Sequence, residues 1–325
     1  MTIDVTYAGY EYEWTSPLWD ERVTPQGVDL TTVDFPNPER FTRMVDLQEF
    51  DAAEVSMGTY LATRSDPAAY PFTAIPVFPY RKLRHSYVFT RRDGDVDTVA
   101  DLHGARVGLI NWQTTTGIWQ RGILAEHHGL DLESVEWVVA GSEIADVAPT
   151  DYDVEVRGDA ESSPVPQLAA DLERGDLDAL FLPVMPGTDA AERLFDDPLT
   201  VERNYVRETG IFPIMHTVVV RDALLEDEPW IVQSLYDAFE DAKRLALDAL
   251  ERPRWMPLAQ SRLLVEQQRA VFGDDPWEYG LSGHNRTTLE TLVRYAHEQG
   301  VAAERYPVEA LFATDHLNAD WFGSS

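Results

Sequence analysis

A dense basic cluster lies between an apolar segment and a β-rich segment in the first third of the chain. Arg81, Lys82, Arg84 and His85 follow the apolar run 72–78 almost directly. The chain has a formal net charge of −31, so this concentration of positive charge is a candidate anion-binding site. Arg84 and His85 can pair with carboxylate oxygens through charge-assisted hydrogen bonds. The alternative is that these side chains only neutralise neighbouring aspartates and glutamates.

Two other segments carry polar groups at positions suited to ligand binding. Segment 54–60 lies where a strand pattern changes to a helix pattern, and segment 112–116 lies just before a helix. Backbone N–H groups and hydroxyls at a helix start can hold an anion, although simple capping explains residues 114–116 equally well. The basic cluster and these segments together supply the candidate residues Glu54, Ser56, Tyr60, Arg81, Arg84, Ser86, Trp112, Gln113, Thr114 and Thr115.

Strand and helix patterns alternate along the chain, which is typical of α/β proteins with parallel sheets. We predict strands at 3–7, 27–34, 50–55, 72–78, 107–110, 135–139, 179–182 and 211–220, and helices at 38–47, 56–64, 118–129, 166–174, 286–299 and from 229 onward. The polar segment 151–163 is expected to run over the surface. In two such α/β halves, ligands bind in the crevice at the strand ends, where the candidate segments would converge.

The composition indicates an unusual surface. The chain of 325 residues is long enough for one large or two medium domains. It has 57 acidic against 26 basic residues, and the acidic ones are spread along its length. We expect a heavily hydrated acidic surface adapted to a salt-rich cytoplasm, where ions screen the self-repulsion. Such a surface argues against nucleic acid as a partner.

The absence of cysteine and of long apolar stretches excludes several classes. Without cysteine there are no disulfides, thiolate nucleophiles, cysteine-ligated zinc sites or lipoprotein anchors. The first residues lack the basic and apolar regions of a signal peptide, and no stretch is apolar enough to span a membrane. We therefore expect a soluble cytoplasmic protein.

An ordered series of motifs resembles the 4,5-dihydroxyphthalate decarboxylase family. The motifs are RHS at 84–86, DLHGARVG at 101–108, WQRGIL at 119–124, WVVAGSE at 137–143, TGIFPIMHTVVV at 209–220, DPWEYGL at 275–281, NR at 285–286 and EALF at 309–312. The similarity extends in order from about residue 54 to the C-terminus. The ordered combination of these motifs is more specific than any single motif.

The resemblance implies a type 2 periplasmic-binding-protein-like fold. This fold has two lobes, each a mostly parallel sheet flanked by helices, joined by two hinge strands. On this sequence the hinges are expected at 87–90 and 217–220. Lobe 1 would then comprise residues 1–90 and 218–325, and lobe 2 residues 91–217.

The resemblance also implies a reaction, the non-oxidative removal of one carboxylate from 4,5-dihydroxyphthalate to give protocatechuate. The spare carboxylate needs a cationic clamp, for which Arg84 is the candidate, with Arg81 in support. His85 and His216 are candidates for moving a proton to the ring carbon or from a phenol. Glu54 would accept a hydrogen bond from a phenolic hydroxyl, and Trp112 would stack on the ring.

Several alternatives stay open at this point. A binding or sensor protein could hold a small aromatic carboxylate without chemistry. Enzymes of pyrimidine or thiamine precursor synthesis share the fold, but they depend on a His-rich metal site that the sequence does not display. We expect no cofactor and no metal, while a divalent metal held by Glu54, His85 and His216 is an open alternative. The adjacent His127 and His128 are expected to face solvent. A homodimer through an apolar face of the C-terminal helices is also considered.

Overall fold

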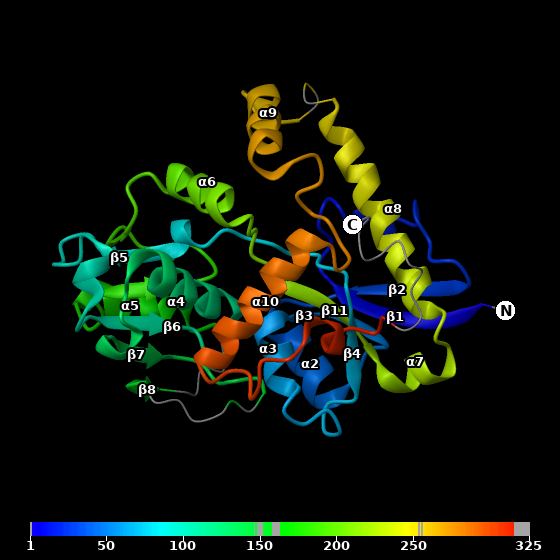
Figure 1. Ribbon diagram of the computed structural model, residues 1–325, viewed down its shortest axis with the longest axis horizontal. Helices are drawn as coiled ribbons and strands as arrows, with labels where there is room; N and C mark the ends of the chain where they lie inside the picture. Colours follow the sequence, from blue (N-terminus) through cyan, green and yellow to red (C-terminus); the bar gives the residue numbers. More distant parts are fainter. Residues whose placement is uncertain are drawn as a thin grey trace.

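The computed structural model shows a mixed α/β protein built around two β-sheets (Figure 1). It describes residues 2–145, 147, 152–157, 163–252, 254 and 256–314. The two sheets lie side by side, each covered by helices, and the chain passes from the first to the second and back again. The predicted α/β architecture of two sheets is confirmed.

The first sheet has the strand order β2-β1-β3-β11-β4. Its strands are β1 (Ile3–Gly9), β2 (Val28–Asp34), β3 (Ala52–Ser56), β4 (Phe72–Ile75) and β11 (His216–Arg221). Strand β1 pairs in parallel with β2 and β3, whereas β11 is antiparallel to both β3 and β4. Because β11 comes from far along the chain, it brings a late segment into the middle of an early sheet.

The second sheet has the strand order β10-β5-β9-β6-β7-β8. Its strands are β5 (Val88–Arg91), β6 (Arg106–Leu109), β7 (Glu136–Val139), β8 (Val154–Val156), β9 (Ala179–Phe181) and β10 (Ala191–Arg193). Strands β6, β7, β8 and β9 pair in parallel, and β5 is antiparallel to β9 and β10. The apolar runs of β6, β7 and β9 are almost fully buried, as expected for strands covered on both faces.

Helices cover both sheets. They are α1 (Ser16–Trp19), α2 (Glu39–Leu47), α3 (Met57–Thr63), α4 (Thr115–His128), α5 (Val165–Arg174), α6 (Pro198–Thr209), α7 (Asp222–Asp227), α8 (Ile231–Leu250), α9 (Ser261–Phe272) and α10 (Gly283–Glu298). Helix α10 packs on both α3, which follows a strand of the first sheet, and α4, which follows a strand of the second sheet. It therefore links the parts of the protein around the two sheets. The first half of α8 packs against the body, whereas its end and α9 rise away from it (Figure 1).

Most predicted elements are present, and some boundaries differ. The expected strand 72–78 ends at Ile75, and the helix expected from residue 229 begins at Ile231. Of the expected hinge segment 87–90, residue 87 belongs to a 3₁₀ turn (His85–Tyr87) and the strand β5 begins at Val88. In the polar segment 151–163, β8 forms at Val154–Val156, whereas residues 151 and 158–162 lie outside the described residues.

The segments expected to act as hinges belong to different sheets, β5 to the second and β11 to the first. The lobe boundaries at residues 90 and 217 stay a prediction. Within the described residues, no helix is both long enough and apolar enough to cross a membrane.

Candidate active site

A buried carboxylate and a histidine meet at one end of the first sheet. Strand β11 pairs with β3 so that His216 lies opposite Ser56 and Val218 opposite Glu54. In this register the Nδ1 atom of His216 lies 2.5 Å from Oε1 of Glu54. The two residues are 162 positions apart in sequence, so only the return of the chain through β11 brings them together.

Glu54 is held by groups from three further positions. Arg40 on α2 places its Nη2 atom 3.4 Å from Oε2, and both side chains are fully buried. The Nε atom of Arg40 also donates to the backbone carbonyl of Glu54 at 3.2 Å. Tyr12 donates its hydroxyl to Oε1 at 2.8 Å, and the backbone N–H of Tyr10 donates to Oε2 at 3.2 Å. This is the partnering that a buried carboxylate requires.

These surroundings give Glu54 and His216 different charge states at neutral pH. Burial by itself raises the pKa of Glu54, but the Arg40 guanidinium and the hydrogen bonds from His216 and Tyr12 outweigh burial and lower that pKa to about 2. Burial lowers the pKa of His216, against the opposing effect of Glu54, and the nearby Arg40 and Arg84 lower it further. At neutral pH the pair is therefore an ionised glutamate beside a neutral imidazole.

This arrangement can act as a general base. The glutamate accepts from Nδ1–H and so fixes the imidazole tautomer, which leaves the lone pair on Nε2. In the described part of the chain, no group hydrogen-bonds to Nε2. The pair thus has the geometry by which a carboxylate orients a histidine for proton transfer.

Aromatic side chains surround His216. The ring of Phe41 meets it edge-on at 5.3 Å between centroids, and the ring of Tyr80 lies at 5.0 Å. Tyr80 in turn stacks on Tyr12, which stacks on Trp14. The segment after β1 is thereby fixed over the Glu54–His216 pair, and it limits the entry of water.

Arg84 is a buried cation that forms no ion pair within the described part of the chain. It is 1% exposed, its Nε atom has only the sulfur of Met215 at 3.4 Å, and its Nη1 atom has no hydrogen-bond partner. Burial lowers its pKa to about 10, so it stays charged at neutral pH. It lies close enough to His216 to influence the pKa of that residue. Tyr80, Tyr87 and Glu202 partly offset the effect of burial on the Arg84 pKa, and the unsatisfied Nη1 atom leaves one donor for an anionic ligand.

The end of strand β3 contacts the start of helix α4 through Ser56 and Thr115. The hydroxyl of Ser56, which precedes α3, lies 2.7 Å from the hydroxyl of Thr115 at the start of α4. The same Thr115 oxygen accepts from the backbone N–H of Gly58 at 2.8 Å. A Cβ on Gly58 would lie 1.9 Å from the carbonyl oxygen of Gln113, so this contact requires glycine. Ser56 occupies the N-cap position of α3, but its side chain makes no capping hydrogen bond.

Three of the sequence candidates serve the packing of the protein instead of facing a ligand. Arg81 donates to the carbonyls of Phe212 and Glu278 and to the side chain of Asn285, so it does not support Arg84. Tyr60 is fully buried, with its hydroxyl bonded to the Leu311 carbonyl. These corrections share one cause, since the polar ends of both side chains are used by backbone groups of distant segments.

Trp112 is the third correction. Its ring is 3% exposed, carries the Arg121 guanidinium 3.8 Å from its centroid, and donates its indole N–H to the carbonyl of Gln299. The structure therefore leaves no free face of Trp112 for the predicted stacking on a substrate ring.

Gln113 and Thr114, the remaining candidates in the loop before α4, hydrogen-bond to backbone carbonyls nearby. Gln113 is fully buried and donates its side-chain amide to the Ala145 carbonyl, while Thr114 donates its hydroxyl to the Asn111 carbonyl. The backbone N–H of Ser86 donates to Glu202 on α6. Of the candidates in and near this loop, Thr115 is the one that hydrogen-bonds to Ser56 and Gly58 of the β3–α3 segment.

His85 lies apart from the Glu54–His216 pair. Its ring packs edge-on against His128, Phe195 and Tyr205, and neither of its nitrogens has a hydrogen-bond partner among the described residues. Burial, with the nearby His128 and His127, lowers its pKa to about 3. It is therefore poorly suited to proton transfer, contrary to its predicted role. His128, expected to face solvent, is half-buried against it, whereas His127 is exposed.

The structure also adds two residues that sequence reasoning missed, Arg40 and Tyr12. A signal for Arg40 was present, because it interrupts the apolar face of the helix pattern 38–47 beside Phe41 and Met44. Tyr12 lies in a connection whose partner is 42 residues away, and no local pattern indicates it. Among the described residues, no group of three or more histidine, aspartate or glutamate side chains is arranged to hold a metal ion. The expectation of a metal-free site stays a prediction.

Fold and site together define a class of protein, a two-lobed type 2 periplasmic-binding-protein-like fold carrying a buried acid–histidine pair. Solved structures show the same fold. The aliphatic sulphonate binding protein SsuA from Escherichia coli superposes with a TM-score of 0.55 at 12% identity, covering 95% of this chain and 91% of that one. A mutant of DszB in complex with biphenyl-2-sulfinic acid gives 0.55 at 20% identity, covering 97% and 98%.

Sequence comparison is more specific. A 4,5-dihydroxyphthalate decarboxylase from Comamonas testosteroni is 29% identical over 328 residues, covering 95% of this chain and 96% of the relative. One from Pseudomonas putida is 30% identical over 217 residues, covering 63% and 82%. No protein-family model matches the sequence. The chain belongs to the 4,5-dihydroxyphthalate decarboxylase family, a family of carboxy-lyases. The resemblance inferred from the motifs is thereby confirmed.

Proposed function

We propose that this protein removes one carboxylate, without oxidation, from a dihydroxylated aromatic dicarboxylate. The substrate is 4,5-dihydroxyphthalate or a close analogue, and the product protocatechuate or its counterpart. The observation that carries the proposal is the buried Arg84 guanidinium, which forms no ion pair with a described residue, keeps an unsatisfied Nη1 atom and lies near the neutral His216 that ionised Glu54 orients. Family membership supplies the reaction class.

The reaction sets three physical demands. The ring carbon that loses CO₂ must receive a proton. Electron density must reach that carbon, and deprotonation of a hydroxyl para to the carboxylate provides it. The other carboxylate must be fixed, while the leaving one should be poorly solvated.

Arg84 meets the demand for a clamp. Its unsatisfied Nη1 can donate to an oxygen of the spare carboxylate, and the ion pair formed would neutralise a charge that is otherwise buried alone. Since burial leaves its pKa at about 10, the clamp stays cationic over the whole range in which the substrate is a dianion.

His216 meets the demand for a base. Its Nε2 takes the proton of the para hydroxyl, and the imidazolium so formed is stabilised by ionised Glu54. The phenolate pushes electrons into the ring, and the para carbon takes up a proton. The bond from that carbon to the carboxylate carbon then breaks, its electron pair restores the aromatic phenolate, and CO₂ leaves. The phenolate takes its proton back from the His216 imidazolium, so the proton on the ring carbon is the one drawn from solvent. Overall one proton is consumed for each CO₂ released.

An assay of the purified protein in concentrated KCl tests the proposal. The protein is incubated with 4,5-dihydroxyphthalate, and CO₂ and protocatechuate are followed with and without a chelator. Equal amounts of both products in either sample are expected. Activity that the chelator abolishes would replace the metal-free expectation with a metal-dependent one.

Substrate binding without product would instead favour a binding or sensor protein. We also propose that the enzyme works in the cytoplasm and has no nucleic-acid partner, in line with its composition.

A further inference from the structure

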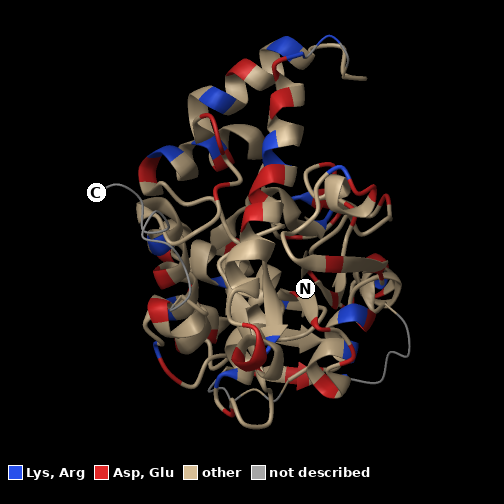
Figure 2. Cartoon of the chain, turned by 90° about the vertical axis from the view of Figure 1, so that its right-hand side faces the viewer, with Lys and Arg blue, Asp and Glu red and all other residues tan. Residues whose placement is uncertain are grey.

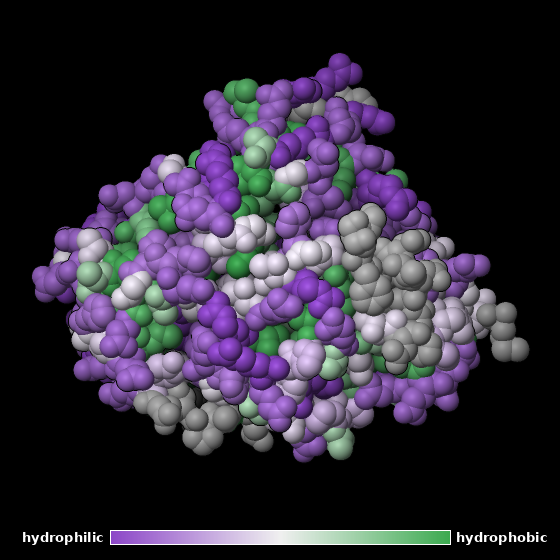
Figure 3. Space-filling view, in the orientation of Figure 1, coloured by the Kyte–Doolittle hydropathy of each residue, from purple (hydrophilic) through white to green (hydrophobic). Residues whose placement is uncertain are grey.

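A hollow between α6, α9 and residues 81–87 differs in charge from the rest of the molecule. Acidic residues are spread along the chain, as the side shown in Figure 2 illustrates, and many basic side chains are paired with them. The hollow has a volume of about 360 Å³, which is within the range of small-ligand pockets. In the space-filling view, hydrophobic atoms are visible in the region where α6 and α9 approach each other (Figure 3).

Three cations line this hollow, and none of them is paired with a carboxylate of the described residues. Arg81 is 3% exposed; its Nη atoms donate to groups of distant segments, and its Nε atom has no hydrogen-bond partner in the described chain. The ammonium of Lys82 lies 5.1 Å from the centre of the Tyr87 ring. Arg193 donates its Nε–H to a backbone carbonyl. These cations are therefore available to an anion.

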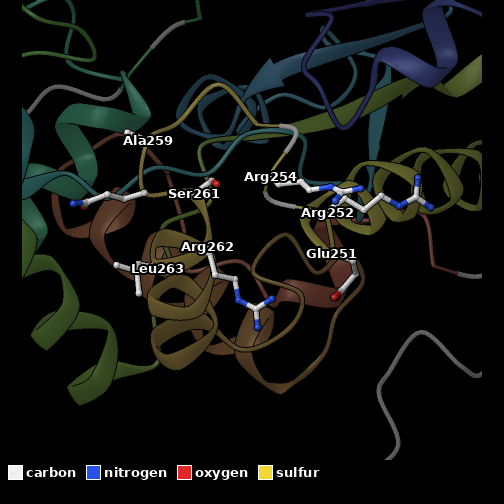
Figure 4. A pocket seen from close by; sticks show the side chains of 8 residues that line it. Glu251, Arg252, Arg254, Ala259, Ser261, Arg262 and Leu263 are labelled. Atoms are coloured by element: carbon white, nitrogen blue, oxygen red, sulfur yellow. The ribbon is translucent and has the colours of Figure 1, made fainter.

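One carboxylate, that of Glu202, lines the same hollow and accepts a hydrogen bond from a backbone N–H. Three cations and one carboxylate give the lining a charge of +2, in a chain of −31. A larger hollow of about 840 Å³ beside α9 differs, because its Arg262, labelled in Figure 4, is paired with Glu266. Unpaired positive charge thus distinguishes the smaller hollow.

Aromatic rings supply the apolar part of the lining. The ring centroid of Phe212 lies 5.0 Å from that of Phe272 and 5.6 Å from that of Trp277. Trp277 is stacked in turn on Trp14 at 4.2 Å. Because these rings hold one another in place, they offer a preformed surface for a further aromatic ring.

We propose that this hollow is a second binding site, whose ligand is an aromatic monocarboxylate. Lys82 and Arg193 bind the carboxylate through charge-assisted hydrogen bonds, and the ring of the ligand packs against Phe212 and Trp277. The Glu202 carboxylate repels a second acidic group, which favours a ligand with one.

This site is separate from the proposed clamp, since Arg84 is not among the residues that line the hollow. The two are neighbours, because the Arg84 guanidinium lies 5.5 Å from the centre of the same Tyr87 ring that Lys82 contacts. The product of the proposed reaction belongs to the ligand class, but the inference rests on the hollow alone. A binding experiment therefore tests it whether or not the protein is a decarboxylase.

Titration calorimetry with benzoate, at a fixed KCl concentration, tests the site in an Arg84→Ala protein that lacks the clamp. Benzoate should bind, and acetate, which has no ring, should bind at least about tenfold more weakly. Adding Lys82→Gln or Arg193→Gln should raise the benzoate Kd roughly tenfold, the effect of losing a hydrogen bond to a charged group. Arg207→Gln, at an exposed arginine of α6, is the matched control and should leave Kd unchanged.

Absence of benzoate binding, equal binding of acetate, or an equal loss in the control would overturn the proposal. Circular dichroism checks that each variant is folded.

Photolabelling of the wild-type protein gives a measurement that needs no Arg84 variant. The protein is irradiated with 4-azidobenzoate, and the modified peptides are identified by mass spectrometry. Modification within residues 268–277, which line the hollow but lie far from Arg84 in sequence, is expected. Excess benzoate should reduce it, and so should Lys82→Gln combined with Arg193→Gln. Modification confined to segments outside the hollow, or insensitive to benzoate, would contradict the inference.

Discussion

At the scale of single residues, the site combines one cation without a counterion and one carboxylate with several partners. Glu54 accepts from His216, Tyr12 and the backbone of Tyr10, and it lies beside Arg40. Arg84 forms no ion pair with a described residue, and its Nη1 atom has no hydrogen-bond partner there. The carboxylate is therefore fixed before a ligand arrives, whereas the cation is left to interact with the ligand. Removing the Arg84 side chain should therefore weaken ligand binding, whereas a change in the Glu54–His216 pair should slow turnover.

Arg84→Ala should lose affinity for the dicarboxylate. A hydrogen bond to a charged group is worth about 1.5–3 kcal/mol, or roughly 10- to 150-fold in Kd. Isothermal titration with 4,5-dihydroxyphthalate measures the loss. Arg244→Ala, at an exposed arginine on α8, is the control and should bind like wild type. Retained affinity in Arg84→Ala would remove that residue from the clamp role.

His216→Asn should keep binding but lose turnover. An asparagine preserves a polar group of similar size and cannot relay the proton, so we expect kcat to fall by about 10²- to 10⁴-fold, the usual contribution of a general base. His284→Asn, at an exposed position, is the control. Normal turnover in His216→Asn would dismiss the acid–base assignment, and a loss confined to KM would point to binding instead.

The pH dependence of kcat/KM follows from the direction of the His216 shift. Burial lowers the pKa of His216 from its ordinary 6.5, and only the neutral imidazole acts as a base. The value of kcat/KM should therefore rise with pH through an apparent pKa below 6.5 and be level at neutral pH. An acid limb centred above 6.5 would contradict this.

At the scale of elements, the regular pattern of the chain predicts more than its side-chain contacts. Alternating apolar strands and amphipathic helices sufficed for the α/β fold, and strand ends indicated where Glu54 and Thr115 lie. Such patterns do not tell which way a side chain turns. Arg81, Tyr60 and Trp112 lie near the expected segments but hydrogen-bond to distant carbonyls.

The Glu54–His216 contact depends on the pairing of β3 with β11, and this non-local pairing has no local signature in sequence. The motif at 209–220 marked His216 through family resemblance alone. Arg40 illustrates the opposite case, in which a charged residue within an apolar helix face gave a local signal.

Helix α2 is attached to strand β3 through Arg40, so removal of this side chain should be strongly destabilising. Arg40→Met leaves Glu54 buried without its counter-ion, a change that typically costs about 3–5 kcal/mol of unfolding free energy. Denaturant titration measures the loss. Arg43→Met, which breaks a more exposed ion pair on the same helix, should cost about 1 kcal/mol or less.

The pH dependence of stability gives an independent check on Arg40. The pKa of Glu54 falls from 4.5 to about 2 on folding, so its contribution is present above pH 4.5 and is lost as pH drops toward 2. Without Arg40 the pKa of Glu54 should rise, and the loss should begin at higher pH. If Arg40→Met unfolds with the wild-type free energy and pH profile, Arg40 does not hold Glu54.

At the scale of the whole molecule, charge dominates. A net charge of −31 spread over one chain means repulsion between acidic side chains at distances that low salt does not screen. The Debye length shortens from about 10 Å at 0.1 M to about 3 Å at 1 M salt. Arginine pairs such as Arg106 with Glu155 and Arg157 with Asp171 remove only part of the repulsion.

We therefore expect thermal stability to increase with KCl. Between about 0.1 M and 1 M, screening should add at least about 1 kcal/mol of unfolding free energy, or roughly 2–4 °C in Tm for a domain of this size. Scanning calorimetry over a KCl series measures it. KCl is preferred to sulfate, which strengthens apolar burial in any protein. A Tm independent of KCl would argue against adaptation to salt.

The position of β11 has a consequence for the order in which the protein is synthesised. The first sheet needs residues His216–Arg221 between β3 and β4, whereas the second sheet is complete at Arg193. On the ribosome, the second sheet can therefore close while β3 and β4 still have unpaired edges, and such edges are prone to aggregate. The nascent chain thus needs protection of its N-terminal segment until β11 emerges, and the Glu54–His216 pair can form only then.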